Sequence, residues 1–182
     1  MFLFWQKGYA ETSIGDLVEV TGVQRYGLYS TFGEKHAFFL KCLDYYLDVM
    51  VSQMVQGMEA EGAGWEAIES FFDTLLYIAG EPTNEYGCLM CRSASEMGRS
   101  DEDVAQKMAA YTKRLGSCFE KSLVQSQIDG VLGNQLDIKK AAHYLLYTTV
   151  SFFNLSKSGV SNDHLTEFMN VSLQGVKALS KE

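Results

Sequence analysis

The stretch GYAETSIGDLVEVTGVQRYGLYSTFGEK, residues 8–35, contains the signals for two short helices around a glycine. Ser13 is followed three positions later by Asp16, which is typical of a capping box, where each side chain satisfies a free backbone N–H at the start of a helix. A short helix is therefore expected over residues 14–21. Its buried stripe should consist of Ile14, Leu17 and Val18.

Gly22 interrupts the helical pattern, and a second short helix is expected over residues 24–31. This helix should bury Leu28 and turn its first residues outward, namely Gln24, Arg25, Tyr26 and Gly27. A capped helix, a glycine turn and a second helix with an outward-facing start are the parts of a helix-turn-helix. The second helix of that motif enters the major groove of DNA.

The pattern over residues 3–39 resembles the N-terminal signature of the TetR family of transcriptional regulators. The residues that carry the resemblance are Gly8 to Leu17, Thr21-Gly22-Val23, Leu28 to Phe32, and Lys35. The resemblance implies an all-α fold with a helix-turn-helix head and a helical body that dimerises and binds a small effector. Residues 1–7 look like the last turns of an amphipathic helix, so we expect that helix to begin before residue 1, as a truncated form of the family's first helix.

The resemblance also assigns the residues that contact DNA. It places Gln24, Arg25, Tyr26 and Gly27 on the groove-facing surface, with Tyr29, Lys35 and Ser13 at backbone phosphates. Arg25 is the candidate for a guanine edge, because its guanidinium matches the two acceptors there, and Gln24 could pair with adenine or with phosphate. The alternative for Arg25 and Lys35 is that each is a solvated surface charge.

Charge and composition restrict the partners of the chain. The formal net charge is −8, yet residues 1–41 hold four cations and four anions, so the excess of negative charge lies in residues 42–182 and any DNA contact should come from the head. The four cysteines, without a secretory pattern, are expected to be reduced thiols of a cytoplasmic protein. No apolar run is long enough to predict a membrane span.

The remaining chain shows helical spacing without an alternating strand pattern. About nine helices and no sheet are expected, divided into a head, residues 1–41, and an effector-binding and dimerisation body, residues 42–182. After the head, the helices should cover residues 35–59, 65 to a stop at Gly80-Glu81-Pro82, 88–97, 102–129, 137–157, and a last one capped by Asn162 or Asp163. In the helix from residue 35, the apolar stripe is expected to include Phe38, Leu40, Leu43 and Tyr46.

The last two helices carry stripes of small and large apolar residues that suit packing between subunits. The resemblance implies a two-fold homodimer formed through Leu145, Thr148, Phe152, Leu165, Phe168, Ser172, Leu173 and Val176. A dimer would present two recognition helices to a palindromic double-stranded operator, about 34–36 Å apart. The alternative is that these residues form the chain's own core.

Three consecutive helices concentrate methionine and aromatic side chains, which suit an adaptable apolar pocket. In the family this region holds the effector, here expected to be a small apolar molecule. The candidate lining residues are Phe72, Leu75, Leu76, Tyr86, Leu89, Met90, Ser93, Met97, Met108, Tyr111 and Leu115. Core packing is the alternative for each of them.

The pair Cys88 and Cys91 has CxxC spacing, which fits a zinc or redox site. No second pair accompanies it, and the three histidines are scattered, so no metal and no cofactor are expected. A thiol-sensing role stays open.

The sequence thus predicts a ligand-responsive DNA-binding regulator, most readily a repressor that a small apolar molecule releases from its operator, and not an enzyme. Two alternatives remain. One is a helical ligand-binding dimer without DNA binding, and the other is a small all-α enzyme that would use Glu96, Tyr111 or His143 as acid-base groups.

Overall fold

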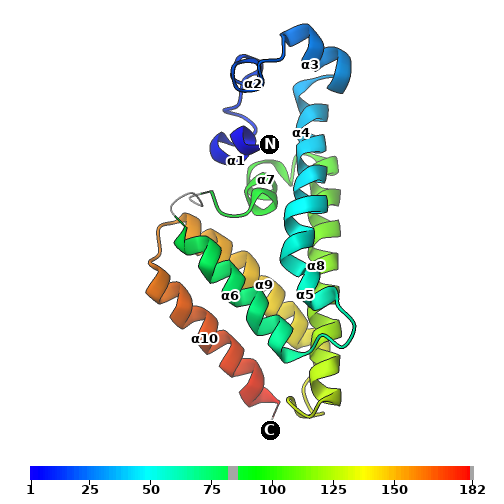
Figure 1. Ribbon diagram of the computed structural model, residues 1–182, viewed down its shortest axis with the longest axis vertical. Coiled ribbons are helices and arrows are strands. Elements are labelled where there is room, and N and C mark those ends of the chain that lie inside the picture. The colour runs from blue at the N-terminus through cyan, green and yellow to red at the C-terminus, as the bar shows by residue number, and fades with distance from the viewer. Residues whose placement is uncertain (82–85, 181–182) are drawn as a thin grey trace. The chain divides into compact units, whose positions relative to one another are not determined.

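The computed structural model describes residues 1–81 and 86–180, and every regular element in these ranges is a helix (Figure 1). Counted with α4, η1 and α5 as one continuous run, the described residues form nine helices, as expected. No helix among them is both long and apolar enough to cross a membrane. The elements are α1 (Phe2–Lys7), α2 (Ile14–Thr21), α3 (Arg25–Phe32), α4 (Lys35–Tyr45), the π-helical turn η1 (Tyr46–Val51), α5 (Ser52–Glu59), α6 (Trp65–Gly80), α7 (Leu89–Met97), α8 (Glu102–Ile128), α9 (Ile138–Lys157) and α10 (Asn162–Leu179).

Most helix ends follow the local signals in the sequence. The Asp137 side chain caps α9 by accepting a hydrogen bond from the backbone N–H of Lys140. The cap of α10 was assigned to the wrong residue, because the Ser161 side chain accepts from the backbone N–H of His164, and Asn162 and Asp163 already belong to the helix. Helix α6 ends at Gly80, and Pro82 lies outside the described residues.

The long helix from Lys35 differs from expectation in which side chains it buries. Its buried stripe is Phe39, Cys42, Leu43 and Tyr46, while Phe38 and Leu40 are half-buried. The spacing of three, four and seven residues makes this one helical face. The π-helical turn that starts at Tyr46 adds an offset to that face, and no local sequence signal predicted it.

The chain forms two compact units. The first contains residues 1–51 and 88–109, and the second contains residues 52–87 and 110–182. The predicted head, residues 1–41, therefore packs in one unit with α7 and the first residues of α8. The division at residue 41 stays a functional prediction.

The core of the first unit is a cluster of rings from α1, the following loop and α4. Phe39 is 1% exposed, and its ring centroid lies 5.0 Å from that of Phe4 and 4.9 Å from that of Tyr9. Trp5 packs edge-on against Tyr46, with ring centroids 5.2 Å apart. This cluster fixes α1 on α4 and so supports the helices that follow.

The second unit contains α6, α9 and α10 side by side, as Figure 1 shows. Its core includes Phe71, Phe72 and Phe119, whose rings lie 5.2–5.8 Å apart. Lys177 of α10 forms an ion pair with Glu69 of α6 at 2.9 Å. These contacts join the C-terminal helix to the core of the body.

Candidate nucleic-acid interface

The start of α3 turns outward, as the sequence predicted. Tyr26 is 84% exposed, Gln24 and Arg25 are exposed, and Gly27 is half-buried. Leu28, on the opposite side of the helix, is buried. Arg25 forms no ion pair with any residue in ranges 1–81 and 86–180, so its guanidinium is available to a partner. Contact of these residues with DNA stays a prediction.

The turn between α2 and α3 depends on two glycines. Gly22 ends α2 in the left-handed conformation, with φ 69°, which L side chains rarely adopt. Gly27 lies under Val23, and a Cβ added there would come within 3.0 Å of Val23 Cγ1. The absence of a side chain at Gly27 therefore allows the turn to pack closely on α3.

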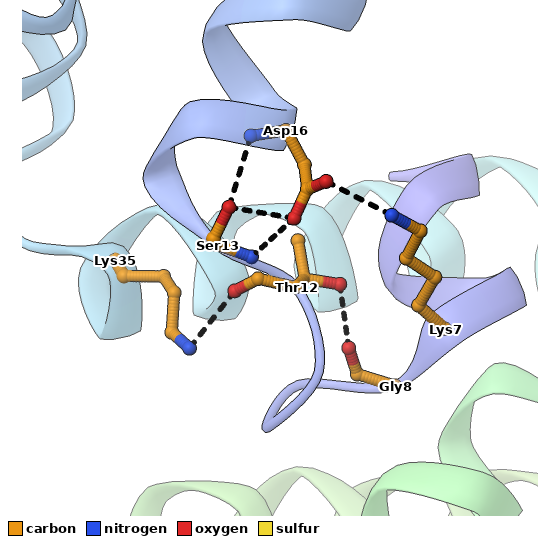
Figure 2. Close-up of polar contacts among 6 residues, drawn as sticks. All are labelled: Lys7, Gly8, Thr12, Ser13, Asp16 and Lys35. Carbon is orange, nitrogen blue, oxygen red and sulfur yellow. Dashed lines mark hydrogen bonds and ion pairs between the residues drawn. The ribbon is translucent and has the colours of Figure 1, made fainter.

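A capping box starts α2 (Figure 2). The Ser13 hydroxyl oxygen accepts a hydrogen bond from the backbone N–H of Asp16 at 3.1 Å, and the Ser13 backbone N–H donates to the Asp16 carboxylate at 2.7 Å. The Ser13 hydroxyl also donates to this carboxylate at 2.6 Å, and Lys7 pairs with it at 2.9 Å. The hydrogen bonds from Ser13, followed by that from Lys7, hold the pKa of Asp16 well below its usual range. The Ser13 hydroxyl thus has a structural task, and its phosphate contact stays a prediction.

Replacing Ser13 with alanine should lower the free energy of unfolding by about 0.5–2 kcal/mol, the usual cost of losing an N-cap. The lowered pKa of Asp16 adds a pH dependence. A depressed carboxyl pKa stabilises the fold above the unfolded-state value, about 3.9, and this contribution is lost as the pH falls further. Thermal unfolding should therefore show that the gap between wild type and Ser13→Ala narrows below about pH 4.

The control for this substitution is Ser95→Ala. Ser95 is an exposed serine whose hydroxyl donates only to the Cys91 carbonyl of its own helix, so its replacement should change stability by no more than about 0.5 kcal/mol. Equal losses for Ser13→Ala and Ser95→Ala would show that the capping box contributes nothing particular.

Lys35 binds its own chain, where the resemblance led us to expect a phosphate contact. Its Nζ donates to the carbonyl oxygens of Tyr9 and Thr12, each at 3.0 Å, and lies 4.2 Å from the centre of the Tyr9 ring (Figure 2 shows the bond to Thr12). Two of its three N–H groups are therefore used to fix the loop between α1 and α2. A phosphate contact would have to come from the third.

Lys35→Ala should lower the free energy of unfolding by about 1–3 kcal/mol, because two carbonyls lose a charged donor in a half-buried setting. The matched control is Lys41→Ala, which removes the same charge from an exposed position of α4 and should leave unfolding nearly unchanged. Chemical denaturation measures both. If Lys35→Ala has the same free energy of unfolding as Lys41→Ala, the hydrogen bonds of Lys35 do not contribute to the stability of the fold.

Glu96 of α7 holds the same loop from its other side, which the sequence did not predict. Its two carboxylate oxygens accept hydrogen bonds from the backbone N–H groups of Tyr9, at 3.0 Å, and Ala10, at 2.6 Å. Gly8 has φ 88°, and a Cβ there would lie 2.7 Å from Glu96 Oε2 and 3.0 Å from Arg92. Helix α7 is therefore part of the support of the helix-turn-helix. Glu96 had been considered only as an acid-base group.

The predicted effector residues are distributed over both units, and all are buried or half-buried. In the first unit lie Leu89, Met90, Ser93, Met97 and Met108, and in the second lie Phe72, Leu75, Leu76, Tyr86, Tyr111 and Leu115. Their role in binding an effector stays a prediction. A hollow of about 500 Å³ in the second unit is lined by other residues, at the start of α9 and the end of α10.

The residues predicted to form the dimer interface are placed mainly inside the single chain. Leu145, Thr148, Phe152, Leu165, Ser172 and Val176 are buried there, and Phe168 and Leu173 are half-buried. The stripe that was expected to meet a second copy is therefore largely the core of the body. The exposed large apolar side chains of the same two helices are Tyr144, Tyr147, Val171 and Leu179.

Among the described residues, the structure brings together one group that could hold a cation. His36 Nε2 lies 2.6 Å from Asp101 Oδ2, and the ligand atoms of His36, Asp101 and Asp103 lie within 4.8 Å of one another. Asp101 also caps α8 by accepting from the Val104 N–H at 3.0 Å, and this bond and that from His36 lower its pKa against the opposing effect of burial. No ligand spacing in the sequence indicates this group, because His36 and Asp101 are 65 positions apart.

Comparison with known proteins agrees with this geometry. Residues 1–42 match a family model described as bacterial regulatory proteins, tetR family. Over 172 residues, the chain is 30% identical to the HTH-type transcriptional regulator YezE of Bacillus subtilis (strain 168), covering 94% of this chain and 89% of that protein. It is 25% identical over 175 residues to the HTH-type transcriptional repressor ComR of Escherichia coli (strain K12), covering 96% and 83%.

Solved structures share the fold. A cysteine mutant of the TetR family transcriptional regulator CifR, complexed with 26-bp double-strand operator DNA, has a TM-score of 0.82 at 21% identity, covering 94% of this chain and 90% of that chain. The reduced form of E. coli NemR has a TM-score of 0.79 at 18% identity, covering 97% and 90%. The all-α expectation is therefore confirmed.

Proposed function

Because the chain belongs to the TetR family of bacterial transcriptional regulators, we propose that the start of α3 binds the major groove of an operator and that a small apolar molecule controls this binding. The observation that carries the proposal is the outward start of α3. Arg25 and Tyr26 are exposed there, while Leu28 anchors the helix in the head. Side chains in this position of a helix-turn-helix reach base edges.

Charge supports the same assignment. Lys7 is paired with Asp16, and Lys35 is bound to two backbone carbonyls, so Arg25 is the cation at the start of α3 that stays free to meet DNA. Its guanidinium can form two parallel hydrogen bonds with the O6 and N7 acceptors of guanine. Tyr29, 42% exposed one turn further along, is placed to contact phosphate.

The regulator acts as a homodimer on a palindromic operator under this proposal. Two copies of α3 must meet successive major grooves about 34–36 Å apart, which a two-fold pair achieves. The face that suits a second copy is the exposed apolar one on α9 and α10, with Tyr144, Tyr147, Val171 and Leu179. The hollow between the start of α9 and the end of α10 borders Tyr144 and Leu179, which fits interdigitation with a partner helix.

Tyr147→Glu should convert the dimer to a monomer, because it places a charge in the centre of an apolar interface. Size-exclusion chromatography with light scattering measures the mass. Ile128→Glu is the matched control, since Ile128 on α8 is 72% exposed, comparable to 63% for Tyr147, and should leave the mass unchanged. A dimer that persists in Tyr147→Glu would place the interface elsewhere.

We further propose that the regulator is a repressor and that its effector lies among the buried methionine and aromatic side chains of the body. ComR, 25% identical, is named a repressor, which supports the first part. The lining of methionines and rings supports an apolar ligand. A ligand releases the regulator from DNA only if it binds the DNA-free conformation more tightly than the DNA-bound one. A candidate effector must therefore raise the operator Kd when it binds.

The test of DNA binding is fluorescence anisotropy with labelled DNA taken from upstream of the chain's own coding sequence. We expect saturable binding that exceeds binding to a scrambled duplex of equal length by about 10³-fold or more, and that weakens steeply with salt. Equal affinity for both duplexes across the salt range would contradict the proposal.

A further inference from the structure

Two thiols lie together at the start of α7. Cys88 is the N-cap residue of this helix, and Cys91 is the third residue inside it. Both are buried, at 3% and 5% exposure, and both are free. Cα atoms three positions apart on a helix lie about 5 Å from each other, which is within the roughly 4.4–6.8 Å that the Cα atoms of a disulfide span. A hydrogen bond between the two thiols, with Cys91 as the donor, lowers the pKa of Cys88 and raises that of Cys91.

The surroundings of Cys88 favour its thiolate. Burial raises the pKa of this thiol, but hydrogen bonds from Cys91, from the Tyr46 hydroxyl and from the backbone N–H groups of Cys91 and Met90 outweigh it and lower the pKa. The Tyr46 hydroxyl lies 3.5 Å from Cys88 Sγ. Donation to Cys88, followed by burial, raises the pKa of Cys91. Cys88 is thus suited to act as a nucleophile, and Cys91 stays protonated.

The other two cysteines lack this arrangement. Burial raises the pKa of Cys42 and of Cys118, and the groups that shift these two pKa values include no second thiol. Only the α7 pair, Cys88 and Cys91, combines a nucleophile with a resolving thiol.

We propose that the α7 pair is a reversible oxidation site for small hydroperoxides and that its disulfide loosens the helix-turn-helix. The Cys88 thiolate attacks the terminal oxygen of the peroxide, the O–O bond breaks, and the leaving hydroxide or alkoxide takes up a proton. Cys88 is then a sulfenic acid. The Cys91 thiol attacks its sulfur, the S–O bond breaks, and water leaves as the disulfide forms. Two electrons pass from the thiols to the peroxide. An external dithiol then reduces the disulfide and restores the two thiols.

The size of the oxidant follows from burial. Both sulfurs are almost inaccessible, so a reagent the size of hydrogen peroxide reaches them during small openings of the structure, whereas an aromatic disulfide reagent is excluded. The site therefore selects for small hydroperoxides.

Two contacts link the α7 pair to the helix-turn-helix. Tyr46, which donates to Cys88 Sγ, also packs edge-on against Trp5 of α1. Glu96, two turns further along α7, holds the backbone N–H groups of Tyr9 and Ala10. Formation of the disulfide draws the Cys88 sulfur toward Cys91 and removes the thiolate that Tyr46 donates to. A shift of Tyr46 then displaces α1 through Trp5, and a shift of α7 displaces the loop that leads to α2 through Glu96.

The first experiment measures the chemistry in the full chain. Hydrogen peroxide should remove two hydrogens per chain from the wild type, seen by intact mass spectrometry, and dithiothreitol should restore them. Cys91→Ala should stop at a sulfenic acid on Cys88, seen in the same mass measurement as the gain of one oxygen per chain. Cys118→Ala, a control with the same 5% exposure, should behave like wild type. Four intact thiols after treatment, or oxidation that is equal in Cys91→Ala and wild type, would overturn the proposal.

The second experiment measures the link to the head through Trp5. The chain has two tryptophans, so a Trp65→Phe background leaves Trp5 as the reporter. The emission of Trp5 should change on oxidation and return to its starting value with dithiothreitol. In the double variant Trp65→Phe/Cys91→Ala, the same treatment should leave the emission unchanged. A disulfide that forms without any change in Trp5 emission would overturn the link.

The effect on DNA rests on the proposed function. Oxidation should raise the operator Kd by about 5- to 150-fold in wild type and Cys118→Ala, and leave it unchanged in Cys91→Ala. If the reduced chain binds no DNA, the proposed function fails, and mass and Trp5 emission still decide the oxidation site. An oxidised chain that binds as tightly as the reduced one would contradict loosening of the head.

Discussion

Replacing Arg25 with alanine should weaken operator binding by about 30-fold to 10⁴-fold. A bidentate contact between arginine and guanine is worth about 1–3 kcal/mol, and a dimer loses two of them, so about 2–6 kcal/mol is expected. Affinity for a scrambled duplex should fall much less, because phosphate contacts supply most of that binding. Fluorescence anisotropy on both duplexes at one stated salt concentration measures the difference.

Arg99→Ala is the control for this prediction. Arg99 is an exposed arginine after α7, outside the helix-turn-helix, and its replacement removes the same charge from the same unit. The operator Kd of Arg99→Ala should stay within a few fold of wild type. If the two variants lose the same affinity on both duplexes, Arg25 contributes only its charge and reads no base.

Phe39→Ala should lower the free energy of unfolding by about 3–5 kcal/mol and abolish operator binding. Its ring is buried against Phe4 and Tyr9, so truncation leaves a cavity at the point where α1 and the following loop rest on α4. Urea denaturation followed by circular dichroism measures the stability, with attention to whether the head unfolds separately.

The neighbouring residue provides a matched control. Phe38 is half-buried, with its ring 6.0 Å from Phe4 and 4.7 Å from Phe32, and Phe38→Ala should cost clearly less than Phe39→Ala. Phe39→Leu should restore most of the lost stability, because it refills part of the cavity. A larger loss for Phe38→Ala would mean that the buried face of α4 has been assigned to the wrong ring.

Helix α2 and the phenylalanine pair Phe38 and Phe39 of α4 show how far the sequence could predict the fold. The bounds of α2 could be predicted because Ser13, Asp16 and Gly22 act within one turn of the helix they start or end. The buried face of α4 could not be chosen correctly, because adjacent phenylalanines fit either register and the π-helical turn at Tyr46 shifts the later positions.

The candidate site was predicted in part for a similar reason. The outward start of α3 follows from local periodicity, whereas Glu96 and Lys35 act on the loop after α1 from 87 and 26 positions away. No pattern of spacing predicts such contacts. The apolar stripes of α9 and α10 were assigned to a partner because packing within a chain and packing between copies require the same side chains.

Those long-range contacts show how the head is held. The loop between α1 and α2 is fixed through its carbonyls by Lys35 and through its amides by Glu96, so α4 and α7 both set the position of the helix-turn-helix. A change that moves α7 therefore reaches DNA binding without passing through α3 itself. This is the physical basis on which an event in the body could act on the head.

Dimethyl sulfate footprinting of the upstream DNA, which methylates guanine N7 in the major groove, tests the central claim most directly, namely that the start of α3 enters the major groove twice in a symmetric pair. The account predicts two protected patches about one helical turn apart with wild type, related by a palindrome, and their loss with Arg25→Ala but not with Arg99→Ala. A single patch, or protection that survives Arg25→Ala unchanged, would contradict it.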